Sequence, residues 1–280
     1  MRTRVTLLLA LALAALLVAA AAGCVSGSSG SAGKKGSIIL ATTTSTEDSG
    51  ILAEFVKEFE AANPSYDVKS VAVGSGAALF MGSNGDADIM ITHEPKAEKQ
   101  FVAAGNAASY EDLMHNDFLI VGPASDPAQI KGMMDGVEAV KAIAASKSPF
   151  VSRGDASGTN AMEMTLWERA GITPTPPWYI SAGQGMGETL RIANEKQAYA
   201  LTDRASFTVL ANALDLKPMV QGDPTMLNQY TVTVVNHKKF PGTNYAGALA
   251  LAKFLESEKT KKMISGFGWK QYKVHLFVPD

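Results

Sequence analysis

Hydrophobic and polar residues alternate along this chain with two distinct periods. In several segments the apolar residues recur at helical spacing, as Leu52, Phe55 and Phe59 do. Short, β-rich apolar runs lie between these helical segments. Strands that alternate with helices are typical of parallel sheets joined by right-handed crossovers. The pattern therefore predicts an α/β fold with mainly parallel sheets flanked by helices.

The predicted elements form two series. Strands are predicted at 37–41, 68–73, 87–91, 118–121, 149–152, 199–202 and 230–235, and helices at 51–62, 136–145, 159–170, 187–195 and 245–257, with another opening at 77–81. The last strand and the last helix resemble the first series, so we expect the chain to return to its first domain. Gly122 and Pro123 fit an exit from a strand into a linker.

We therefore expect two α/β lobes. The first lobe comprises 37–121 together with 231–280, and the second comprises 122–230. The chain would cross between them near 120–123 and 229–235, and two crossing strands make a hinge. The region from residue 37 onward is long enough for one large or two modest domains.

The N-terminal segment has the layout of a secretory signal peptide. Arg2 and Arg4 precede an apolar run over 5–22 that ends in small residues. The length of this run would also suit a membrane helix, but its alanine-rich composition and position at the extreme N-terminus favour a cleaved leader. We therefore interpret 1–23 as a signal peptide and expect the mature protein to be exported.

Cys24 is the only cysteine of the chain and predicts a lipid anchor. The small residues before it suit cleavage and acylation of its thiol, as in a bacterial lipoprotein. Such a motif usually carries leucine where Ala21 stands, so a plain cleavage site remains the alternative. We interpret 24–36 as a lipidated cysteine and a flexible Gly/Ser-rich tether. The protein would then be held on the cell membrane, facing the periplasm or the cell exterior.

The charge of the chain argues against a general attraction to nucleic acid. Its 25 lysine and arginine residues stand against 27 aspartate and glutamate residues, a formal charge of −2 at pH 7. Loss of the predicted leader removes two arginines and leaves −4. An anion would therefore need a local site against a mildly negative background. We expect a monomer with no nucleic-acid partner and no disulfide.

Four turns rich in hydroxyls and glycine each follow the carboxyl end of a predicted strand. They span 42–46, 74–76, 152–159 and 183–187. Ligands bind at this edge of open α/β sheets, where helix N-termini offer free N–H groups and the positive ends of their dipoles. Serine and threonine also cap ordinary helices, but five hydroxyls in succession exceed what a cap needs. Thr43, Thr44 and Ser45 are therefore candidate oxyanion ligands.

Arg153 is the strongest single candidate. It follows a predicted strand in a glycine-flanked turn, and its guanidinium can offer two parallel N–H donors to an oxyanion. A surface arginine paired with Asp155 is the alternative interpretation. If Arg153 binds a ligand, we expect Asp155 to orient the guanidinium rather than to touch the ligand.

Other kinds of site lack their signatures. The sequence contains no nucleotide P-loop, no full dinucleotide fingerprint and no Gly-x-Ser-x-Gly nucleophile elbow. A hydrolase built on Ser157 with a histidine and an aspartate is the one catalytic arrangement left open. The histidines show no metal-site spacing, so we expect no metal and no cofactor. We interpret them as surface or structural residues: His93, His115, His237 and His275.

Several segments together closely resemble the tungstate-binding proteins of tungstate ABC importers. They include TTTSTEDSGIL, VGSGAAL, NDFLIVGPASDPAQIKG, SRGDASGTN, WYISAGQGMGETL and YTVTVVN, and the likeness covers nearly all of 37–267. The resemblance implies a two-lobed periplasmic-binding-protein fold that closes on tungstate and is not an enzyme. It also implies two partners, a membrane permease and its cytoplasmic ATPase.

The resemblance carries the family's hydroxyl loop, Gly-Ser-Gly turn and arginine loop over to this chain residue by residue. The implied oxyanion-binding positions are Thr43, Thr44, Ser45, Ser75, Arg153, Ser157, Gly158 and Thr159. The chain departs from the family at Glu94, where alanine is more usual after the histidine. We expect the Glu94 carboxylate to face away from the cleft.

Such a site suits a fully deprotonated anion. Tungstate at neutral pH only accepts hydrogen bonds, and hydroxyls, backbone N–H groups and one arginine supply donors. Phosphate, which is often protonated, is better matched by a site with an accepting carboxylate. The alternatives are a binding protein for molybdate, sulfate or phosphate, and, less favoured, an enzyme acting on a phosphorylated or sulfated substrate. Tungstate and molybdate differ too little in size for the sequence to separate them.

Overall fold

The computed structural model describes residues 36–280, in which strands and helices alternate for most of the chain. The predicted signal peptide at 1–23, Cys24 and the tether up to residue 35 lie outside the described residues. Within the described part, no helix is both long enough and apolar enough to cross a membrane.

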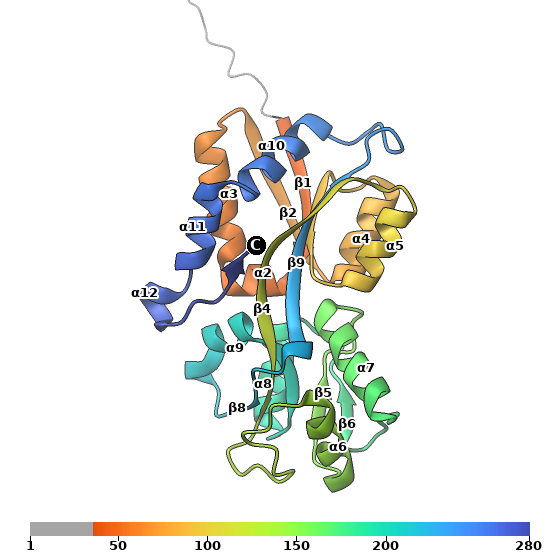
Figure 1. Cartoon of the computed structure of the whole chain (residues 1–280), viewed down its shortest axis with the longest axis vertical. Helices are drawn as coiled ribbons and strands as arrows, with labels where there is room; N and C mark the ends of the chain where they lie inside the picture. The colour runs from red at the N-terminus through yellow and green to blue at the C-terminus, as the bar shows by residue number, and fades with distance from the viewer. Residues whose placement is uncertain (1–35) are drawn as a thin grey trace, which may run out of the picture. The chain divides into compact units, whose positions relative to one another are not determined.

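The main sheet has the strand order β10-β4-β9-β3-β1-β2 (Figure 1). β1 (Gly36–Thr43) pairs in parallel with β2 (Tyr66–Val73) and with β3 (Ile89–Thr92). β9 (Leu227–Val235) pairs antiparallel with β3 on one side and with β4 (Ala107–Gly122) on the other. The short β10 (Val278–Pro279) then pairs antiparallel with β4.

Strand β4 serves both halves of the molecule. Its residues up to Asp117 pair with β9, whereas those from Phe118 pair antiparallel with β7 (Ala200–Asp203) and β8 (Lys217–Val220). We therefore call residues 36–117 and 227–280 lobe 1, and residues 118–226 lobe 2. The lobe bounds expected from the sequence stay a prediction.

Lobe 2 adds a small parallel sheet to the end of β4. β5 (Phe150–Ser152) pairs with β6 (Tyr179–Ser181), and Phe150 forms a further parallel bridge to Tyr199 just before β7. The carboxyl ends of β5 and β7 therefore lie near each other. A loop begins at residue 153 after β5, and a helix begins at residue 204 after β7.

Helices flank the strands of both lobes. In lobe 1 they are α2 (Thr44–Ser49), α3 (Ile51–Ala62), α4 (Ser75–Asn84), α5 (Pro95–Ala103), α10 (Tyr245–Leu255), α11 (Glu258–Gly266) and α12 (Trp269–Tyr272). In lobe 2 they are α6 (Gly136–Ser146), α7 (Gly158–Ala170), α8 (Met186–Glu195) and α9 (Arg204–Leu210), with 3-10 turns η1 (Ala211–Ala213) and η2 (Pro224–Met226). Figure 1 places α2 and α4 at the boundary with lobe 2.

The α/β class and the flanking helices are confirmed, but the expectation of mainly parallel sheets is wrong. β4 pairs antiparallel with each of its neighbours, and β9 is antiparallel to both of its own. A chain that leaves lobe 1 along one strand and returns along the adjacent strand runs in opposite directions along the two. The sheet is therefore mixed, because the crossing strands lie in its middle.

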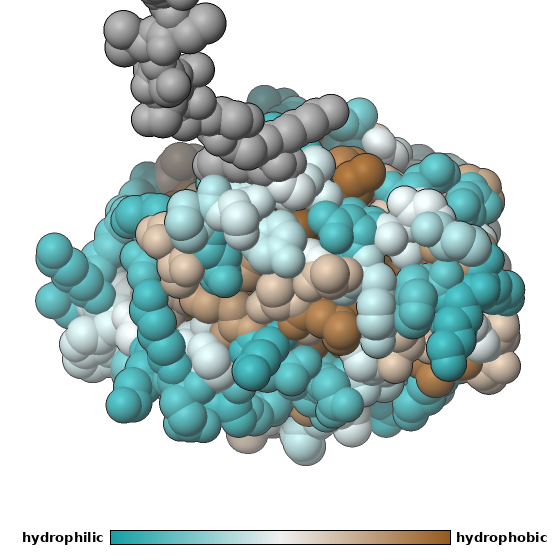
Figure 2. Space-filling model, turned by 90° about the horizontal axis from the view of Figure 1, so that it is seen from above, coloured by the Kyte–Doolittle hydropathy of each residue, from teal (hydrophilic) through white to brown (hydrophobic). Residues whose placement is uncertain are grey.

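Each lobe has its own apolar core. In lobe 1, Phe55 and Phe59 of α3 are buried against the sheet, so the helical face predicted from the sequence is the buried one. In lobe 2, Phe150 and Trp167 meet edge to face with ring centroids 5.3 Å apart. The surface of lobe 1 seen end-on in Figure 2 is mostly hydrophilic, with smaller apolar areas between.

Candidate functional site

The hydroxyl-rich segment at 42–46 divides its side chains between two tasks. Thr46 donates to the Thr43 carbonyl oxygen at 2.7 Å, and its hydroxyl lies 2.8 Å from that of Thr42, so these groups close the start of α2. The Thr43 hydroxyl instead lies 3.0 Å from the Ser45 hydroxyl. The segment was expected to be a turn, and its second half is the first turn of α2, although the N-cap Thr43 makes no side-chain cap.

The Gly-Ser-Gly turn forms the start of α4 and approaches lobe 2 closely. The buried Ser75 hydroxyl accepts a hydrogen bond of 3.3 Å from the backbone N–H of His93. A Cβ atom on Gly76 would lie 3.1 Å from the carbonyl oxygen of Ala156 in lobe 2. A side chain at this position would require the neighbouring loop of lobe 2 to shift by a few tenths of an ångström.

Arg153 connects the lobes through its guanidinium. Its side chain is only 2% exposed, and Nη2 donates to Asp155 Oδ2 at 2.5 Å and to Thr44 Oγ1 of lobe 1 at 3.2 Å. Within residues 36–280 its Nε atom is buried without a hydrogen-bond partner. Asp155 thus holds the guanidinium as expected, while a second donor edge remains uncommitted.

The arginine loop continues into the N-terminus of α7. The Ser157 hydroxyl caps this helix by accepting from the N–H of Asn160 at 3.1 Å. A Cβ on Gly158 would lie 2.4 Å from the carbonyl oxygen of His93, so only glycine allows this approach between lobes. The Thr159 hydroxyl is buried and has no partner in the described part of the chain.

Helix N-termini from both lobes converge on the same place. The N-caps of α4 and α8 are Gly74 and Gly185, neither of which supplies a side-chain cap. A Cβ on Gly185 would lie 3.7 Å from the Thr44 hydroxyl, which places the start of α8 against the start of α2. First-turn N–H groups left uncapped are hydrogen-bond donors at the positive end of a helix dipole.

All eight residues predicted from the sequence therefore lie at the boundary between the lobes. The contacts above join Thr44 to Arg153 and Thr43 to Ser45, whereas Ser157 is occupied as a helix cap. Glu94 caps α5 by accepting from Ala97 N at 3.0 Å. The binding roles of the eight residues stay predictions.

A second buried carboxyl group lies near the guanidinium. Asp203 caps α9 by accepting from Ser206 N at 2.9 Å, and its Oδ2 atom has no partner among residues 36–280. Burial raises the pKa of the Asp203 carboxyl, and the positive charge of Arg153 opposes that rise. The sequence did not single out Asp203, although the residue follows the carboxyl end of a predicted strand, as the other candidates do.

His93 is a buried part of the lobe boundary, which sequence reasoning missed as a candidate. Its ring stacks on Tyr230 with centroids 4.7 Å apart, and Nδ1 lies 2.6 Å from Asn228 Oδ1. Burial lowers the pKa of His93 to about 4, so the ring is neutral at neutral pH. Within the described residues, no group of three or more His, Cys, Asp or Glu side chains could hold a metal ion.

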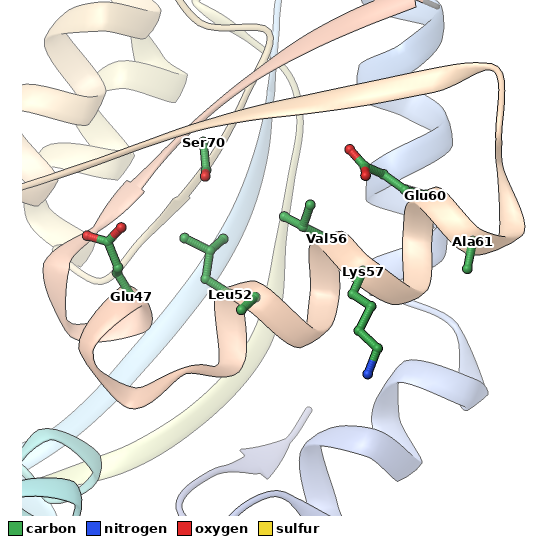
Figure 3. A pocket seen from close by; sticks show the side chains of 8 residues that line it. Glu47, Leu52, Val56, Lys57, Glu60, Ala61 and Ser70 are labelled. Carbon is green, nitrogen blue, oxygen red and sulfur yellow. The ribbon is translucent and has the colours of Figure 1, made fainter.

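The surface of the described residues also has open pockets. One of 680 Å³ lies between α3 and β2, and its charged groups are those of Glu47, Lys57 and Glu60 (Figure 3). Two carboxylates against one ammonium group disfavour an anion there. Another pocket, of 420 Å³, lies between α2 and α8 and is lined by Thr44 and Arg191 together with the carboxylates of Asp48 and Glu188, so its charge balance does not favour an anion either.

Comparison with known proteins identifies relatives over most of the chain. Residues 21–259 match the PBP superfamily domain. Tungstate-binding protein TupA of Peptoclostridium acidaminophilum is 45% identical over 248 residues, 88% of this chain and 86% of that protein. The solved structure of the tungstate ABC transporter from Geobacter sulfurreducens has a TM-score of 0.75 and 41% identity, over 82% of this chain and 98% of that one. TupA of Desulfovibrio alaskensis G20 gives 0.72 and 39%, over 88% and 99%.

Acidification is expected to weaken the fold through His93. Because its pKa is about 4 in the folded protein and about 6.5 when unfolded, the unfolded chain binds the proton more tightly. The destabilisation caused by His93 is absent above pH 6.5 and grows as pH falls towards 4. At pH 5 it lowers the free energy of unfolding by about 2 kcal/mol. Urea unfolding at pH 7 and pH 5 should show this loss in the wild type and not in His93→Gln.

The exposed His275 provides the control for this experiment. His275→Gln should lose stability between pH 7 and pH 5 as the wild type does. An equal loss in His93→Gln and the wild type would show that His93 is not the group responsible.

Proposed function

The chain belongs to the PBP superfamily and to the family of the tungstate-binding proteins within it, and from this premise we propose that it captures tungstate between its lobes for an ABC importer. It is a solute-binding protein and not an enzyme, since the relatives are named for binding and transport. Two observations support tungstate as the ligand and an ABC importer as the partner. They are the names of those relatives and the chemistry of the boundary between the lobes.

A buried arginine shared between the lobes is the observation that carries this proposal. Arg153 is paired with Asp155 on its own lobe and with Thr44 on the other, and its Nε–H is left over within residues 36–280. An unpaired buried donor on a charged group is costly, and a bound oxyanion would satisfy it. We place the tungstate oxygens within reach of this edge.

The remaining groups at the boundary suit a deprotonated dianion. The hydroxyls of Thr43, Ser45 and Thr159 and the N-termini of α4, α7 and α8 are donors gathered from both lobes. Tungstate only accepts hydrogen bonds, so it can satisfy each of these donors, and it has no O–H group that would need an acceptor from the protein. The helix N-termini include three of the predicted residues, with Ser75 at the start of α4 and Ser157 and Gly158 at the start of α7.

Capture by closure follows from the division of donors between lobes. Lobe 1 supplies the hydroxyl segment and α4, and lobe 2 supplies Arg153 and α7, so only the closed arrangement brings all of them to one anion. A ligand that binds the closed form better shifts the population towards it. The importer, a membrane permease with its ATPase, would then receive the closed, loaded protein.

We also propose that the protein is exported and held at the membrane. The leader at 1–23 would direct export, and Cys24 would carry the lipid that keeps the folded body on the cell surface or in the periplasm. The tether leaves the body free to reach its permease as a monomer.

Replacing Arg153 by alanine is expected to weaken tungstate binding by about 2–3 kcal/mol, or roughly 30- to 160-fold, because a charged donor is lost from a closed site. Isothermal titration calorimetry of the purified protein measures this directly, with molybdate, sulfate and phosphate titrated alongside. Arg169→Ala is the matched control, since Arg169 lies at the other end of α7 and bonds only Thr225 among the described residues. Equal affinities in Arg153→Ala and the wild type would remove the arginine from the site.

A methyl group at Gly158 is expected to hold the lobes apart. The added Cβ would lie 2.4 Å from the His93 carbonyl oxygen, so closure would cost strain and tungstate affinity should fall at least about fivefold. Gly242→Ala is the control, because no atom lies within 4 Å of a Cβ built there. Small-angle scattering with saturating tungstate should give a larger radius of gyration for Gly158→Ala than for the wild type. If Gly158→Ala binds tungstate and becomes as compact as Gly242→Ala and the wild type, closure does not depend on this contact.

A further inference from the structure

A series of buried hydrogen bonds runs from the Leu276 carbonyl to the hydroxyl segment, and the donor and acceptor of each bond can be worked out from this end. The backbone carbonyl of Leu276 can only accept, so the Asn116 side chain, 3.3 Å away, must present its Nδ2 to it. The Asn116 Oδ1 is therefore an acceptor. Asn228 Nδ2 donates to it at 2.8 Å.

The donors and acceptors of the next two hydrogen bonds are fixed in the same way. Asn228 Nδ2 donates its second hydrogen to the Tyr230 hydroxyl oxygen at 3.1 Å. Its Oδ1 then faces His93 Nδ1 at 2.6 Å, and so the histidine must carry its proton on Nδ1. A turned Asn228 amide would place two acceptors against each other, and so would a His93 ring without a proton on Nδ1.

Tyr230 connects Asn228 to the hydroxyl segment and determines which atom donates in the next hydrogen bond. Its side chain is fully buried, and in residues 36–280 its hydroxyl bonds only Asn228 and Ser45, the latter at 3.0 Å. Since Asn228 donates to it, the phenol hydrogen would be left unsatisfied unless it pointed at Ser45 Oγ. Ser45 therefore accepts from Tyr230, and its own hydrogen must point elsewhere.

The last two hydroxyls of this series, those of Ser45 and Thr43, lie at the place proposed for the anion. The Ser45 hydrogen can go to Thr43 Oγ1 at 3.0 Å or to a ligand. Thr43 has no further side-chain partner in the described region, so its hydrogen can go to Ser45 Oγ or to a ligand. We propose that Tyr230 and Asn228 are positioning residues, which fix Ser45 and Thr43 as hydrogen-bond donors and so select anions that carry no proton.

This inference rests on the proposed function, because it assigns a selectivity to the same site. A hydroxyl that is free to rotate can donate to one anion and accept from another. A Ser45 hydroxyl that accepts from Tyr230 and also from Thr43, 3.0 Å away, has both lone pairs occupied, so it can only donate and offers no acceptor to the O–H of a protonated anion. Phosphate keeps at least one proton near neutral pH, whereas tungstate and sulfate keep none. The site should therefore favour the unprotonated anions for a reason separate from size.

The test replaces Tyr230 by phenylalanine and measures tungstate and phosphate binding at neutral pH, with phosphate measured by competition. The tungstate affinity should fall about threefold to tenfold, because Ser45 loses the bond that orients it. The phosphate affinity should stay constant or rise, so that the ratio between the two anions narrows. Tyr110→Phe is the matched control, since it loses a comparable hydrogen bond to Glu98 away from the lobe boundary.

A double-variant experiment separates orientation from general damage. In a Ser45→Ala background the Tyr230→Phe change should have little further effect on the ratio, because the hydroxyl it orients is gone. Equal losses for both anions, or losses that simply add to those of Ser45→Ala, would overturn the proposal. So would an unchanged ratio in Tyr230→Phe.

Asn228→Ala provides a second route if Tyr230→Phe does not fold. It interrupts the chain one link earlier, leaves Ser45 and Tyr230 in place, and should narrow the same ratio. An Asn228→Ala protein that folds and keeps the wild-type ratio would also overturn the proposal. A wild-type protein that binds neither anion would instead remove the proposed function, so the two failures can be told apart.

Discussion

Withdrawal of a guanidinium from water is the constraint around which the lobe boundary is arranged. Arg153 is 2% exposed, and a buried charge is tolerated only when its partners replace the lost hydration. Asp155 supplies one partner from the same lobe and Thr44 another from the opposite lobe, while Nε–H is left over in the described residues. The contact between the lobes and the proposed anion site therefore share one side chain.

Local donors, rather than the overall charge, make the boundary suitable for an anion. The chain is mildly acidic overall, and carboxyl groups of Asp155 and Asp203 lie near the guanidinium. Asp155 is neutralised by its pairing, and burial raises the pKa of Asp203. Attraction then depends on short-range hydrogen bonds that need both lobes, which is a reason for closure to accompany capture.

Local sequence pattern predicted local structure well and long-range contacts poorly. The helix at 51–62 was predicted to the residue, because its apolar face recurs at helical spacing. The first three residues of α2, 44–46, were predicted as part of a turn, since serine and threonine are common in turns and caps. Arg153 could be found from its place after a strand. His93 and Tyr230 could not, because Tyr230 meets Ser45 across 185 positions of sequence.

The location of bound tungsten tests the central claim most directly. A crystal of the protein grown with tungstate, measured at a wavelength where tungsten scatters anomalously, would give one strong peak per molecule. The account predicts that peak between the lobes, within hydrogen-bonding reach of the Arg153 guanidinium and the Thr43 and Ser45 hydroxyls through the anion's oxygens. A peak on the outer surface of either lobe, or no peak at saturating tungstate, would contradict it.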